Sequence, residues 1–93
     1  MTPREISQKL MDLAQEYSKY SGELAHLDKE YADYFNTNRV NFKSDSSCDR
    51  SWDSTPRGVM MRVLERKLKA SDRLMSAYKT HLRLLENESK NLF

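Results

Sequence analysis

The chain has 93 residues, of which 38% are apolar and 32% charged, and its formal net charge is +2. A chain of this length forms one small domain with a modest core, so help from a partner is expected. Only two glycines and two prolines are present, a composition that favours long helices over strands joined by turns.

Apolar residues never form a long run, so we expect neither a membrane span nor a secretory leader. The single cysteine, Cys48, cannot form an internal disulfide, and lone thiols are commoner where thiols stay reduced. These features together predict a cytoplasmic protein.

The first predicted helix spans residues 3–36. Thr2 is a good N-cap, Pro3 suits the first helical position, and Glu5 completes a capping box. Large apolar residues then recur in steps of three and four, which is the spacing of a heptad seam. The seam comprises Ile6, Leu10, Leu13, Tyr17, Tyr20, Leu24, Leu27, Tyr31 and Tyr34.

Residues 37–55 are rich in Asn, Ser and Asp and show no helical or strand periodicity, so they predict a long loop. Aromatic and basic residues stand together in it, and Trp and Arg are common interface anchors. They form a candidate partner-binding loop tip: Arg39, Phe42, Lys43, Arg50 and Trp52. The alternative is that the loop only caps the end of the helices.

The second predicted helix spans residues 56–92. Thr55 and Pro56 repeat the cap and the first helical position, but Gly58 replaces the glutamate of the capping box. The heptad spacing returns, with two serines in the seam: Met61, Leu64, Leu68, Ser71, Met75, Tyr78, Leu82, Leu85, Ser89 and Leu92. The fold class is therefore all-α, an antiparallel helical hairpin of two long heptad-patterned helices. We expect Tyr34 to lie beside Gly58 and Tyr20 beside Ser71.

A second apolar line, the apolar strip, runs beside the seam of this helix and widens its apolar face beyond what one partner helix covers. It comprises Met60, Val63, Ala70, Leu74, Ala77 and Leu84. Exposed in water, a strip of several hundred Å² exceeds what soluble monomers usually tolerate. We therefore expect homodimerisation into a four-helix bundle, with the strip as the dimer interface. The alternative is a monomer whose loop folds over the strip through Val40, Phe42 and Trp52.

Charge divides unevenly along the chain. Residues 3–38 carry four basic and seven acidic side chains, residues 39–55 three of each, and residues 56–93 nine basic and four acidic. Opposite the second seam lies a basic stripe: Arg62, Arg66, Lys69, Arg73, Arg83 and Lys90. Three interpretations stay open: a solvated helix face, a surface for an acidic protein, or a track for a phosphate backbone.

Residues that could carry chemistry are few. His26 and His81 lie too far apart along the hairpin to share a metal ion, and Cys48 has no nearby base to activate it. We expect no enzyme activity, no cofactor and no metal. The sequence predicts a protein–protein interaction module, a small adaptor, accessory or inhibitor protein acting as a dimer. The alternative is a nucleic-acid-binding accessory protein that uses the basic stripe.

Overall fold

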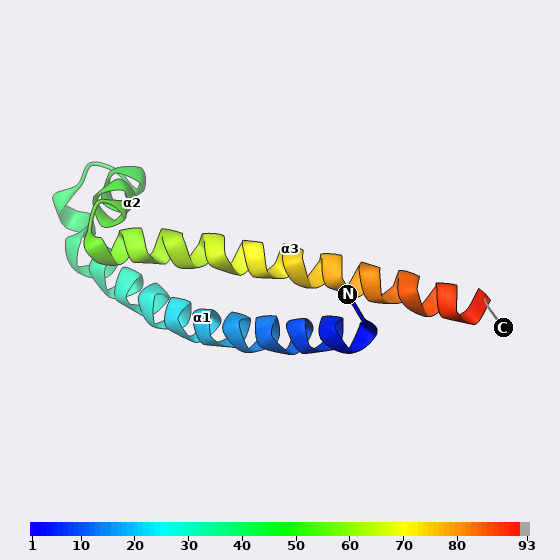
Figure 1. Ribbon diagram of the computed structural model, residues 1–93. Coiled ribbons are helices and arrows are strands. Elements are labelled where there is room, and N and C mark those ends of the chain that lie inside the picture. Colours follow the sequence, from blue (N-terminus) through cyan, green and yellow to red (C-terminus); the bar gives the residue numbers. More distant parts are fainter. Residues whose placement is uncertain (92–93) are drawn as a thin grey trace.

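The computed structural model describes the backbone of residues 1–91 and the side chains of residues 1–88. Its elements are α1 (Pro3–Asn38), the short 3-10 helix η1 (Arg39–Asn41), α2 (Asp45–Asp53) and α3 (Pro56–Asn91), and no strand occurs among these residues. The two long helices run antiparallel, and α2 folds over their connected ends (Figure 1). The molecule is a rod of 69 × 20 × 16 Å, so nearly every residue of the long helices lies close to solvent.

Hydroxyl caps start the two long helices where the sequence predicts them. The Thr2 hydroxyl accepts a hydrogen bond from the Glu5 backbone N–H at 3.2 Å. The Thr55 hydroxyl accepts one from the Gly58 N–H at 3.0 Å and donates to the Trp52 carbonyl at 2.6 Å. Each cap satisfies a donor that the helix itself leaves unpaired, so both starts are set locally.

The predicted loop over residues 37–55 is wrong in part, because it contains a helix. α1 continues to Asn38, and α2 begins after Ser44, whose hydroxyl accepts from the Ser47 N–H at 3.2 Å. The helix is only nine residues long, too short for a repeating apolar pattern to stand out. Its apolar side consists of Cys48 and Trp52, one turn apart and both buried.

The register of the hairpin differs from the predicted one by more than one helical turn. Glu30 pairs with Arg57, and the Lys67 ammonium lies 5.0 Å from the centre of the Tyr20 ring, where Ser71 was expected. The C-terminal end of α3 consequently projects beyond the start of α1 (Figure 1). α2 lies at the connected ends, where the sequence predicted a loop.

The seam between α1 and α3 is thinly covered. Ile6, Leu27 and Leu64 are buried, and Ser71 is 6% exposed, whereas the seam residue Tyr17 is 38% exposed. Two helices bury one line of side chains between them and leave the flanks of that line in water. The stem therefore has a narrow core with half-buried borders. No helix within residues 1–91 is long and apolar enough to cross a membrane.

Gly58 permits a close approach between α2 and α3 rather than receiving the Tyr34 ring. A Cβ atom at this position would lie 2.0 Å from the Trp52 carbonyl oxygen and 2.7 Å from its carbon. The end of α2 therefore rests directly on the first turn of α3, and only glycine leaves room for it. A Cβ added at Gly22, in the middle of α1, would meet nothing within 4 Å.

Candidate functional site

Trp52, the expected anchor of the loop tip, is 5% exposed and belongs to the core of the connected end. Its ring packs against Tyr34, with centroids 5.4 Å apart, and against Tyr31, at 5.8 Å. Its indole N–H points to the Met61 sulfur at 3.4 Å. These three rings form an aromatic cluster that ties α2 to α1, so Trp52 is not available to a partner.

Polar groups complete the aromatic cluster. The Tyr31 hydroxyl donates to the Asp49 carboxylate, and the hydroxyls of Tyr34 and Ser51 lie 2.5 Å apart. The hydrogen bond to Asp49, helped by desolvation, raises the pKa of Tyr31 to about 12. Each tyrosine of the cluster thus packs its apolar ring against Trp52 and forms a hydrogen bond to α2 with its hydroxyl.

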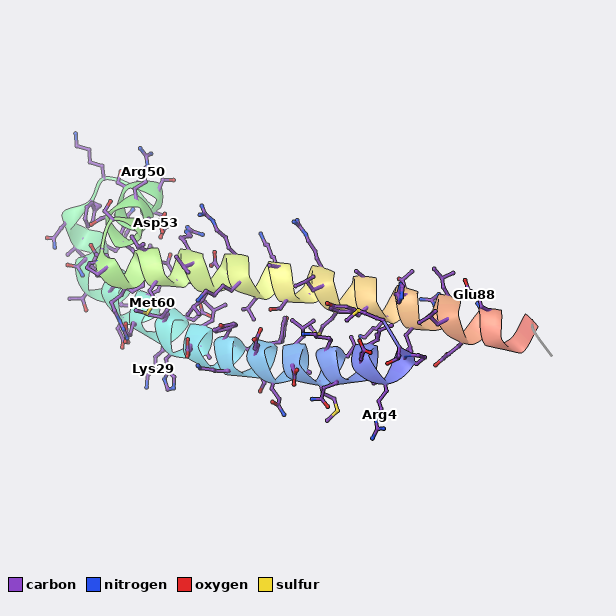
Figure 2. The ribbon with its side chains drawn as sticks, viewed as in Figure 1. Arg4, Lys29, Arg50, Asp53, Met60 and Glu88 are labelled. Carbon is purple, nitrogen blue, oxygen red and sulfur yellow. The ribbon has the colours of Figure 1, made fainter. Side chains whose placement is uncertain are left out.

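The other loop-tip residues do not converge on one surface. Arg39 bonds Asp45 at 2.5 Å and the Phe42 carbonyl at 2.8 Å, so it closes the connection between η1 and α2. Phe42 is half-buried, and Lys43 and Arg50 are exposed. Figure 2 shows Arg50 pointing away from the hairpin on the α2 side. The tip is mainly a structural cap, with two basic side chains on its outside.

The basic stripe is partly neutralised. Arg62 reaches both Asp53 carboxylate oxygens at 3.1 Å and Glu65 at 3.2 Å, and these bonds raise the pKa of its guanidinium. The next members are exposed and form no ion pair with a described residue: Arg66, Lys69, Arg73 and Arg83. The Lys90 side chain lies outside the described residues. An open basic surface therefore follows the middle of α3.

The apolar strip is exposed along its whole length. The exposed fraction is 46% for Met60, 42% for Val63, 48% for Leu74 and 56% for Leu84. Ala70 and Ala77 between them are also exposed. Neither the loop nor α2 covers the strip in this chain, because α2 packs on the other side of the first turns of α3, where Gly58 and Met61 contact Trp52. Among the described residues, the strip is an apolar line on α3 that no other part of the chain covers.

A shallow groove of about 350 Å³ lies between α1 and α3 beside the start of the strip. Its lining comprises Glu23, His26, Leu27, Glu30, Arg57 and Met60. Arg57 donates two hydrogen bonds to the Glu30 carboxylate, at 2.7 and 2.5 Å, and these bonds lower the pKa of Glu30. His26 borders this groove and stays exposed. The groove places the strip on the same side of the hairpin as the Glu23 and Glu30 flank of α1.

Features with catalytic or metal-binding chemistry do not come together in residues 1–88. Cys48 is free and 1% exposed, and no group of three His, Cys, Asp or Glu side chains there is placed to hold a metal ion. His81, on α3, is exposed. The groove is open to solvent, and two of its charged residues, Glu30 and Arg57, form an ion pair with each other.

Sequence reasoning missed α2, the buried position of Trp52 and the contact at Gly58. Ser44 with Asp45 is a recognisable helix start, and Cys48 and Trp52 stand one turn apart, so a signal for α2 was present. The strip and the stripe lie on the helix faces that their spacing predicts. Comparison with protein-family models, curated proteins and solved structures finds no match for this chain.

Proposed function

We propose that this protein is a non-enzymatic protein–protein interaction module, a small adaptor, accessory or inhibitor protein that acts as a dimer of helical hairpins. The supporting observation is the exposed apolar strip, whose four large side chains are each more than two-fifths exposed. Each of these side chains is about half exposed, so covering the rest of it is worth about half of the ~1.5–3 kcal/mol of full burial. Covering all four therefore offsets part of the entropy lost on association. A cytoplasmic location remains the expectation from the single cysteine.

The packing of the connected end supports this function, because it fixes the start of α3, the helix that carries the strip. The aromatic cluster and the close contact at Gly58 fix α2 on both long helices. A surface on a preorganised helix loses less entropy on binding than one on a mobile loop. The strip, rather than the loop tip, is therefore the interaction surface that we propose.

Light scattering at several protein concentrations, combined with Leu74→Glu, tests the dimer. A carboxylate in the middle of the strip would have to be desolvated in a dimer but not in a monomer, so we expect Leu74→Glu to be monomeric. Ser76→Glu is the matched control, because Ser76 is exposed outside the strip and the charge change is the same. Wild-type protein that stays monomeric at every concentration would refute the dimer.

A second candidate function is nucleic-acid binding, which the uncompensated part of the basic stripe favours. Arg66, Lys69 and Arg73 follow one another within two turns of α3, at a spacing that could track a phosphate backbone. We expect a salt-sensitive mobility shift that Arg66→Glu with Arg73→Glu abolishes. Arg4→Glu with Lys29→Glu on α1 makes the same charge change at exposed positions and serves as control. No shift of the wild-type protein at low salt rules this function out.

A further inference from the structure

The order of side-chain sizes along the apolar strip, read with the register of the hairpin, indicates how two copies meet. Large residues, Met60 and Val63, stand at one end of the strip, and Leu84 stands at the other. Ala70 and Ala77 lie between them on either side of Leu74. A second copy can be placed by a 180° rotation about an axis that is perpendicular to α3 and passes through the middle of the strip. The end of one strip then faces the opposite end of the other strip, and the two middle parts face each other.

We propose that the strip binds the strip of a second copy of this chain, with the two α3 helices antiparallel and centred between Ala70 and Leu74. This inference rests on the dimer proposed above and specifies its geometry. Met60 then faces Leu84 of the other copy, and Leu74 faces Ala70. A large side chain meets a small one at the centre, which is how well-packed helix pairs interdigitate. The interface is isologous, so it closes after two copies.

Lys67 is a charged residue on the strip side of α3, between Val63 and Ala70. Its ammonium lies over the Tyr20 ring, 5.0 Å from the centroid. The charged end is thus turned towards α1 of its own chain, and the aliphatic stem remains at the border of the strip, facing Ala77 of the second copy. Lys67 therefore does not oppose the contact between the two strips.

Charges on α1 give an independent reason for the same arrangement. The groove residues show that the strip shares one side of the hairpin with a charged flank of α1 (Lys9, Asp12, Glu16, Lys19 and Glu23). The observed contacts of Glu30 with Arg57 and of Tyr20 with Lys67 place the middle of the strip opposite the Gln15–Glu16 region. The two-fold axis through the middle of the strip therefore also passes near Glu16 of α1. It brings the charged flanks of the two copies together, and the two α1 helices run antiparallel.

In that register, opposite charges face each other on the two α1 helices. Lys9 stands across from Glu23 of the second copy, and Asp12 stands across from its Lys19. The centre given by the side-chain sizes on α3 and the centre given by the charges on α1 agree to within about one residue. Complementary charges of this kind decide orientation more than affinity. A parallel dimer that laid the strip on α1 would instead set apolar side chains against carboxylates.

Like charges remain at two places in this arrangement. Glu16 meets Glu16 of the second copy near the axis, and Arg66 and Arg73 line the outer border of the strip, where salt screens their repulsion. Removing the central repulsion alone should strengthen association. We expect Glu16→Gln to lower the dimer dissociation constant about twofold to fivefold.

Disulfide cross-linking with introduced cysteines tests the orientation. In the proposed dimer the two Met60 positions lie about 36 Å apart along the helices, so Met60→Cys alone cannot cross-link, because a disulfide needs Cα atoms within about 7 Å. A mixture of Met60→Cys and Leu84→Cys proteins should form the mixed disulfide. Wild-type protein is the control for Cys48, which is buried. Cross-linked Met60→Cys alone would overturn the antiparallel arrangement.

Charge reversal tests the register. Lys9→Glu should raise the dimer dissociation constant about fivefold to tenfold, because it places two glutamates face to face at two symmetry-related sites. Lys9→Glu with Glu23→Lys in the same chain should restore wild-type dimerisation. The two residues lie four turns apart on α1, so they cannot rescue each other within one chain. No rescue in a protein that still dimerises would overturn this register, whereas a monomeric wild-type protein would refute the dimer itself.

Discussion

The connected end of the hairpin buries its large apolar side chains more completely than the stem does. At the connected end, three helices converge, and Trp52 is 5% exposed within the aromatic cluster. Along the stem only two helices meet, and the side chain of Leu74 is 48% exposed. A third helix is what closes a core, because two helices cover only one line of each other's side chains. The end is complete within one chain, and the stem lacks the surface that a second copy could supply.

The largest expected effect is at the connected end. Trp52→Ala removes the ring that joins α2 to α1 and leaves a cavity, so the free energy of unfolding should fall by about 3–5 kcal/mol. Urea unfolding followed by circular dichroism measures this at concentrations that keep the protein monomeric. Leu74→Ala on the stem is the matched comparison and should cost less than about 1 kcal/mol under the same conditions. Equal losses would show that the two regions do not differ.

Gly58 lies at a tight contact between α2 and α3, whereas Gly22 lies on an open surface of α1, so alanine should have opposite effects at the two positions. Gly58→Ala forces a Cβ against the Trp52 carbonyl oxygen, and we expect a loss of about 1–3 kcal/mol or more. Gly22→Ala meets nothing and should stabilise α1 by about 0.5–1 kcal/mol, since alanine loses less conformational freedom in a helix. Thermal unfolding of both variants measures this contrast. A stabilising Gly58→Ala would contradict the close approach of α2.

Tyr31 makes the connected end sensitive to alkali. Its folded pKa is about 12, above the ordinary value of 10.0, because the hydroxyl donates to Asp49. This hydrogen bond therefore stabilises the fold fully below pH 10, and the stabilisation is lost as the pH rises towards 12. Tyr31→Phe should cost about 1 kcal/mol at neutral pH and remove this dependence. In an ultraviolet titration, Tyr31→Phe should remove the absorbance change near pH 12, and Tyr17→Phe, at an exposed site, should leave that change in place.

The smallest effect is expected for the ion pair at the border of the two regions. Arg57 lowers the pKa of Glu30, so the pair stabilises the fold above the ordinary carboxyl pKa and loses this effect as pH falls through the lowered value. Both side chains are well exposed, at 41% and 51%, so water screens the pair. Glu30→Gln should lower the urea midpoint slightly at neutral pH and not at all in strong acid. Asp28→Asn, which removes an exposed unpaired charge, is the comparison.

The two long helices could be predicted from the sequence because their causes are local. Thr2 and Thr55 each cap a helix through a residue three positions later, and the apolar spacing repeats often enough to define a face. The same spacing placed the apolar strip and the basic stripe on faces that the structure leaves exposed. Each of these statements depends on residues within a few turns of one another.

Only the tertiary structure decided what the connected end does. The burial of Trp52 depends on Tyr31 and Tyr34, which lie on another helix, and the role of Gly58 depends on the path of α2. The register of α1 against α3 is seen in the contacts of Glu30 with Arg57 and of Tyr20 with Lys67, and no repeat in either helix specifies it. Spacing along a chain determines which face of a helix is apolar, but contacts between distant segments determine which part of that face remains exposed.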